Sequence, residues 1–300
     1  MQHFSTHFGR AAALFIIIIF GNWIIAAQDT VSGTWTAKVK DAASGKINLS
    51  FERKGVRGGK YQNGSTYDIS ELNGLSTGSL QSGSVNFSLV REAGTIQCEG
   101  TFTDGKGSGT YRFVPNYGFA DGLRARGFDL DSDGNSKRES SLEEKLFMAA
   151  MLNVTTALAD DLAGANFGKL GLDDLFKAAI FKIDGKFMAE MKATGFPNLS
   201  MDDLVKARIF KIDAEFVRGI KDMGFGADNF EHLVKYSIFK VTPEYLSSLR
   251  NEGLTNLDPE EVVKLRIFKV DAEFVRKART ENPNISVGDI VNKKIGVWVN

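Results

Sequence analysis

One triplet recurs at a constant interval in the C-terminal half of this 300-residue chain. Isoleucine, phenylalanine and lysine stand in that order at 180–182, 209–211, 238–240 and 267–269, so each copy begins 29 positions after the one before. A second marker has the same period, because Gly195, Gly224 and Gly253 are each followed by a large apolar residue. Self-similarity at a fixed period of this length is typical of repeat arrays, whose units stack on their neighbours. The spacing therefore predicts a repeat array, which we place at residues 118–300.

Each repeat carries the start and stop signals of two short helices. Ser200, with Asp203 three residues later, is typical of a helix N-cap, and an apolar face that includes Ile209 follows. Asp213 is the expected N-cap of the second helix, and Gly224 is its expected left-handed stop. Helices of about ten residues are marginal alone, so they must bury their apolar faces against neighbours. We therefore expect α-helical 29-residue units with two helices each.

Residues 28–117 have the pattern of β-strands. Ile47, Leu49 and Phe51 alternate with polar residues, and pairs such as Asn63-Gly64 and Asp104-Gly105 are turn signals. Several short strands in so short a segment predict a small antiparallel β sandwich or barrel. The fold class expected for the whole chain is therefore α+β and multidomain, with the β domain followed by the helical array.

Two residues of this β domain could be read as functional. Gly33-Thr34-Trp35 resembles the Gly-x-Trp opening strand of lipocalin-type barrels, but the segment is short for an eight-stranded barrel with a ligand cavity. We expect Trp35 to anchor the core. Cys98 falls on the inward face of its strand, so we expect a buried thiol. It is the only cysteine, which excludes an intramolecular disulfide.

Residues 1–27 have the features of an export signal. Arg10 precedes an apolar run at 11–27, and no acidic residue occurs before Asp29. Ile25 and Ala27 would occupy the third and the last position before the cut, where the signal peptidase has its two side-chain pockets. We therefore expect cleavage after Ala27 and export to the periplasm or outside. The alternative is an uncleaved anchor, because the run reaches the lower length limit of a membrane span.

An acidic insertion interrupts the repeat at about residues 131–140. It belongs to the stretch D-L-D-S-D-G-N, in which Asp129, Asp131 and Asp133 alternate and Gly134 follows. This spacing matches the first half of a calcium-binding loop, where alternate carboxylates converge on one cation. The second half departs from that pattern, because Ser140 stands where glutamate is usual. A calcium site and a solvated acidic loop are both open interpretations.

The repeated triplet suggests a binding surface. We expect its phenylalanines to lie in the core and its lysines to form a row along the array, on which an acidic segment of a partner could bind. The alternative is that each lysine stabilises only the C-terminal end of its own helix through the helix dipole. The four lysines are Lys182, Lys211, Lys240 and Lys269.

The repeat unit also resembles a known family. The sequence L-V-K-A-R-I-F-K-I-D-A-E-F-V-R-G-I-K-D-M-G-F at 204–225 is similar to the extracytoplasmic repeats of bacterial membrane-embedded metallopeptidases of the β-lactam-sensor, antirepressor type. The segment G-K-G-S-G-T-Y-R-F-V-P-N at 105–116 resembles the junction before those repeats. The likeness covers roughly residues 100–290 and implies an extracytoplasmic repeat region. This chain has no H-E-x-x-H motif, so no peptidase activity follows.

These observations predict a non-catalytic exported protein that acts as a protein-binding or sensory module, with envelope signalling as its expected setting. The expected partner is a protein bound by the helical repeats, and calcium is the one cofactor that the sequence leaves open. Basic and acidic residues balance at 37 each, which argues against a nucleic-acid partner. A membrane contact is expected only if the N-terminal segment stays uncleaved. The alternative function is a small-ligand-binding β-barrel domain anchored by a structural helical array.

Overall fold

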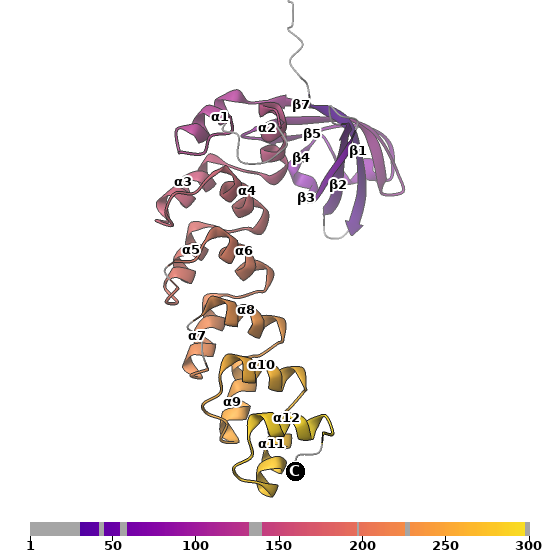
Figure 1. Ribbon diagram of the computed structural model, residues 1–300. Helices are drawn as coiled ribbons and strands as arrows, with labels where there is room; N and C mark the ends of the chain where they lie inside the picture. The colour runs from indigo at the N-terminus through magenta and orange to yellow at the C-terminus, as the bar shows by residue number, and fades with distance from the viewer. Residues whose placement is uncertain are drawn as a thin grey trace, which may run out of the picture.

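The computed structural model describes residues 31–41, 45–54, 59–131, 140–196, 198–225 and 229–297. In these residues an antiparallel β-sheet is followed by a column of α-helices (Figure 1). The strands are β1 (Ser32–Asp41), β2 (Lys46–Lys54), β3 (Lys60–Asp68), β4 (Leu72–Asn73), β5 (Ser82–Arg91), β6 (Gly94–Thr103) and β7 (Lys106–Pro115). The helices are α1 (Tyr117–Arg124), α2 (Leu142–Leu152), α3 (Thr156–Gly164), α4 (Leu172–Phe181), α5 (Gly185–Lys192), α6 (Met201–Ile209), α7 (Ala214–Asp222), α8 (Phe230–Ile238), α9 (Pro243–Asn251), α10 (Pro259–Ile267), α11 (Ala272–Glu281) and α12 (Val287–Lys294). The α+β class, with the sheet before the helices, is therefore confirmed.

The predicted signal segment, residues 1–27, lies outside the described residues, so both cleavage and anchoring stay predictions. Among the described helices, none alone is long and apolar enough to cross a bilayer. Only α2 and α3 together reach that length and composition, and they meet at an angle of 84°.

The seven strands of the sheet are ordered β3-β2-β1-β7-β6-β5-β4, with β3 and β4 at the edges. The predicted alternation sets the register, because Trp35 on β1 pairs with Phe51 on β2 and both side chains are buried. The sheet curls around this apolar face (Figure 1). Phe87 on β5 lies three strands from β1, yet its ring centroid is 5.2 Å from that of Trp35. Three strand spacings on a flat sheet would be about 14 Å, so the curl brings these rings together.

The expected core residues of the β domain are confirmed. Trp35 is fully buried, and its indole N–H donates a hydrogen bond to the carbonyl oxygen of Glu99 at 3.1 Å. Cys98 is fully buried too, and burial raises the pKa of its thiol to about 12. A thiol with such a pKa stays protonated near neutral pH and is a poor nucleophile, so Cys98 acts as an apolar core residue.

Helix α2 covers the apolar face of the sheet at the base of the helical column. Phe147 on this helix stacks on Tyr111 of β7, with ring centroids 5.4 Å apart, and meets Phe51 and Phe113 edge to face. At the border of this apolar contact, the carboxylate of Glu144 pairs with the guanidinium of Arg53 on β2. The sheet and the first helices thus share one continuous hydrophobic core.

The helices begin and end where the sequence predicts. The side chain of Ser200 accepts a hydrogen bond from the N–H of Asp203, and that of Asp213 accepts one from the N–H of Phe216. Gly224 has a φ of 76°, the left-handed conformation expected of a helix stop. The helices are 8 to 11 residues long, so their stability depends on packing against neighbours.

The buried residues of the column form two clusters. The larger cluster runs from the sheet to α10, and the smaller one joins α9 to α12. Tyr245 and Leu257 are partly buried and pack against both clusters. The distal end of the column therefore has a small core of its own.

Replacing Phe147 by alanine should lower the free energy of unfolding by about 3–5 kcal/mol, because it leaves a cavity between the sheet and α2. Urea unfolding followed by far- and near-ultraviolet circular dichroism measures this loss. The control Val90→Ala removes an exposed side chain of β5 and should cost less than about 0.5 kcal/mol. An unchanged unfolding midpoint in the Phe147 variant would show that α2 does not hold the sheet and helices together.

Candidate partner-binding edge of the helical array

The I-F-K triplets close α4, α6, α8 and α10. The lysine of each triplet has a left-handed backbone, with φ of 57°, 55°, 55° and 54° at Lys182, Lys211, Lys240 and Lys269. The residue after each lysine turns inward and donates its N–H to the carbonyl oxygen five residues back, as in the pair Ile183–Ala178 at 2.9 Å. This is the Schellman ending, in which glycine usually takes the left-handed position.

The isoleucines of the triplets are exposed, and the phenylalanines are only partly buried. Ile180, Ile209, Ile238 and Ile267 keep 50%, 54%, 49% and 48% of their surface exposed. Phe239 and Phe268 are 38% and 36% exposed, whereas Phe181 and Phe210 are half-buried against the core. The prediction that Ile209 belongs to the packed face was therefore wrong. The prediction that the phenylalanines are core residues is wrong for Phe239 and Phe268, and it holds only in part for Phe181 and Phe210. The buried position is the one after the lysine, which is Ile183, Ile212, Val241 or Val270.

The C-terminal ends of these helices lie side by side. The guanidinium of Arg208 on α6 donates to the carbonyl oxygen of Lys182 at 2.7 Å, and that of Arg266 on α10 donates to the carbonyl oxygen of Phe239 at 3.3 Å. Between them, the Ser237 hydroxyl donates to the carbonyl oxygen of Phe210. Equivalent residues of the triplets are thus aligned in rows. We call the aligned residues 180–182, 209–211, 238–240 and 267–269 the I-F-K edge.

The side chains of the four predicted lysines are exposed, and among the described residues none of them forms an ion pair. Aspartates follow three of these lysines by two residues, but each is a helix N-cap. Asp213, for example, accepts the N–H of Phe216 at 2.8 Å. The structure therefore aligns the four predicted lysines and leaves their charges available.

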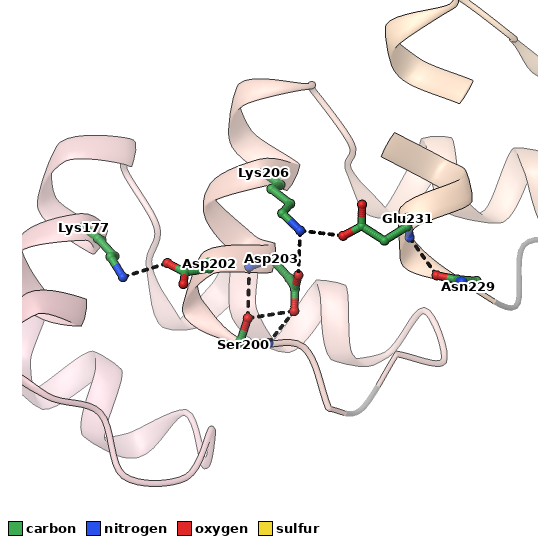
Figure 2. Close-up of polar contacts among 7 residues, drawn as sticks. All are labelled: Lys177, Ser200, Asp202, Asp203, Lys206, Asn229 and Glu231. Carbon is green, nitrogen blue, oxygen red and sulfur yellow. Dashed lines mark hydrogen bonds and ion pairs between the residues drawn. The ribbon is translucent and has the colours of Figure 1, made fainter. Parts of the chain in front are cut away.

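Three lysines in the middle of α4, α6 and α8 are paired, and Figure 2 shows two of these pairs. Lys177 on α4 donates to the carboxylate of Asp202 on α6 at 2.7 Å, and this bond raises the pKa of Lys177 above its ordinary value. Lys206 and Lys235 each pair in the same way with a glutamate 25 residues later, Glu231 or Glu260. This ion-pair ladder compensates the middle lysine of α4, α6 and α8, whereas Lys264 in α10 has no ion pair among the described residues. In α4, α6 and α8 the lysine that stays without an ion pair therefore lies at the I-F-K edge.

Two of the three predicted calcium ligands contact an arginine. Arg124 pairs with Asp131, and its Nε lies 3.2 Å from Oδ1 of Asp129. The N–H of Asp131 also donates to that oxygen at 3.0 Å, and this backbone hydrogen bond lowers the pKa of Asp129. Asp133 lies outside the described residues. A calcium ion bound by Asp129 and Asp131 would have to displace the guanidinium, and the calcium site stays a prediction.

Comparisons with known proteins do not assign the chain to a family: no protein-family model matches it, and no curated protein matches it. Within the part of the chain that the structure describes, no three histidine, cysteine, aspartate or glutamate side chains come together as a metal site would require. The role of the I-F-K edge is therefore inferred from its geometry alone.

Replacing Lys211 by glycine should raise the free energy of unfolding by roughly 0.5–1 kcal/mol, and Lys240→Gly should do the same. A side chain in the left-handed region costs about 1–2 kcal/mol, of which the greater freedom of glycine in the unfolded chain offsets a part. Thermal and urea unfolding measure the change. The control Lys277→Gly lies within α11 and should lose roughly 0.5–1 kcal/mol. If the left-handed variants also lose stability, the lysines serve their own helix ends.

Proposed function

We propose that residues 118–297 form an array of 29-residue units with two helices each. The helix positions support this proposal. Helices α4, α6, α8 and α10 begin at 172, 201, 230 and 259, and α5, α7, α9 and α11 begin at 185, 214, 243 and 272. Both series advance by the step that separates the I-F-K triplets. The left-handed residues between the helices follow the same spacing, from Asn153 to Lys269 and from Asn166 to Gly253.

The function that we propose is that of a non-catalytic exported protein that acts as a protein-binding or sensory module in envelope signalling. One observation carries the proposal: in four successive units, an exposed isoleucine recurs beside a lysine that has no ion pair among the described residues. Single exposed apolar residues are ordinary, but a contiguous row of them marks an interaction surface. The sequence resemblance to extracytoplasmic repeats of membrane-bound sensors points to the same role.

The alternative function, a small-ligand site in the β domain, is favoured by a hollow on the polar face of the sheet. Its volume is about 1010 Å³, and Thr36, Asn48, Thr101 and Ser108 line it together with Lys38 and Lys106. The apolar face offers less room, because the rings of Trp35, Phe87 and Phe102 pack against one another there. A ligand of the β domain would therefore be polar.

Photo-crosslinking in the full chain separates the two functions. When cells that express the variant are irradiated, a photoreactive residue at position 209 or 238 should crosslink to one and the same protein. The same residue at 189, an exposed position of α5 away from the edge, is the matched control and should form none. Adducts from position 101 of the polar hollow, with none from 209 and 238, would refute the array as the binding surface and favour the β domain.

A further inference from the structure

We infer that the I-F-K edge binds one extended segment of the partner, in the polyproline II conformation, with an apolar residue at every third position and acidic residues beside them. This inference rests on the proposed function, because it names the shape and the chemistry of the partner at that surface. Three features of the edge carry it: the spacing of the units, the charge of the lysines and the conformation of their backbone.

The spacing of the units selects the conformation of the segment. Packed helices lie about 8–10 Å apart, so equivalent isoleucines recur at about that distance along the edge. Polyproline II has three residues per turn and rises about 3.1 Å per residue, which repeats each side chain about every 9.3 Å. Side chains on one face of a β-strand recur about every 6.6–6.8 Å, and seven residues of an α-helix span about 10.5 Å. At about 9 Å per unit, the middle of the range for packed helices, the strand and the helix would fall out of register by about 7 Å and about 4.5 Å over four units, against about 1 Å for polyproline II.

The charge of the edge selects the residues beside the apolar positions. Within the described part of the chain, each unit has one unpaired lysine two residues after its exposed isoleucine, whereas the ion-pair ladder compensates the middle lysine of every helix in the row except α10. The unit of Lys240 has the least compensated lysine, because Thr242 replaces the N-cap aspartate that follows the other three lysines. A segment with one ridge of apolar side chains and a neighbouring ridge of carboxylates would complement both rows. Its four apolar contacts would span about ten residues.

The backbone of the lysines indicates that their side chains are required. Glycine takes the left-handed position at the ends of three of the other helices, at Gly195, Gly224 and Gly253, and asparagine takes it at a fourth, at Asn166. A lysine in four equivalent left-handed positions is strained where glycine would be relaxed. Such strain concentrates at functional sites. In α6, α8 and α10 the helix dipole does not require this lysine, because each of these helices already has a basic residue in its last turn.

Fluorescence anisotropy with the full chain tests the inference. The probe is a labelled peptide of four Leu-Pro-Glu repeats, which places leucine and glutamate at every third residue. We expect saturable binding that weakens as salt is raised. The double variant Ile209→Asp/Ile238→Asp should lose more than about tenfold in affinity, and Lys211→Gln/Lys240→Gln should lose about twofold to fivefold per lysine. Lys186→Gln, an exposed position on α5, is the control and should bind as the unmodified chain does.

Three further peptides isolate the features that matter. Leu-Pro-Gln repeats remove the charge, Ser-Pro-Glu repeats remove the apolar ridge, and Leu-Pro-Glu-Ser repeats change the spacing, so each should bind at least about fivefold more weakly. Equal binding of the four-residue repeats, or of a helical peptide with leucine at every seventh position, would overturn the extended register. If the Ser-Pro-Glu repeats bind as tightly as the Leu-Pro-Glu repeats, the edge binds negative charge alone and the apolar ridge contributes nothing. Crosslinks at 209 and 238 without peptide binding would leave the proposed function standing and refute this inference alone.

Discussion

The architecture depends on one constraint: none of the described helices is long enough to be stable alone. With 8 to 11 residues each, they form too few turns to offset the cost of helix nucleation in water. Each helix must therefore bury its apolar face against the next, and the first must have something to lie on. The curled sheet supplies that surface, and the stacking of Phe147 on Tyr111 is the contact through which the column begins. The sheet thus acts as the capping structure that arrays of this kind need at their ends.

Neighbouring helices are then joined by basic side chains that reach back along the column. Lys221 donates to the carbonyl oxygen of Thr194 at 2.7 Å, and Arg279 donates to that of Glu252 at 3.0 Å. Both side chains pass over a left-handed glycine, where a Cβ atom would lie 2.7 Å from the Lys221 Nζ and 2.3 Å from the Arg279 Nη1. Glycine is required at Gly195 and Gly253 for its φ and for this space. Carbonyl oxygens at the C-terminal end of one helix, which have no partner within that helix, thereby accept hydrogen bonds from a neighbouring helix.

The sequence predicted much of this fold because its signals are local. Helix caps depend on residues three apart, and strand faces depend on alternation, so Ser200, Asp213 and Trp35 were assigned correctly. The exposed isoleucines were missed because the apolar pattern does not show where the helix ends. When Lys211 turns the chain into the left-handed region, the inward position shifts from Phe210 to Ile212. A buried aliphatic residue directly before the next N-cap, recurring in four units, was the signal that could have shown this.

The contacts between stacked helices could not be predicted from the sequence, for a different reason. The pairing of Lys177 with Asp202 depends on how far one helix is displaced along the next, which stacking determines and a periodic sequence does not. The pairing of Asp131 with Arg124 likewise depends on the path of the chain after α1. The alternation of apolar and polar residues also predicted which strand residues face inward. It did not predict that β3 and β4 stay at the two edges, so that the sheet curls without closing into a barrel.

The division of the core into two clusters predicts an order in which the helices of the column unfold under force. The distal cluster contains eight buried residues, whereas the proximal cluster is continuous with the sheet. A force applied at the C-terminal end would act on the smaller cluster first, so we expect α11 and α12 to unfold before the proximal helices. Each residue released from a helix lengthens the chain from about 1.5 Å to at most about 3.6 Å. Under tension we therefore expect the distal helices to extend first, while the sheet and the proximal part of the I-F-K edge keep their shape.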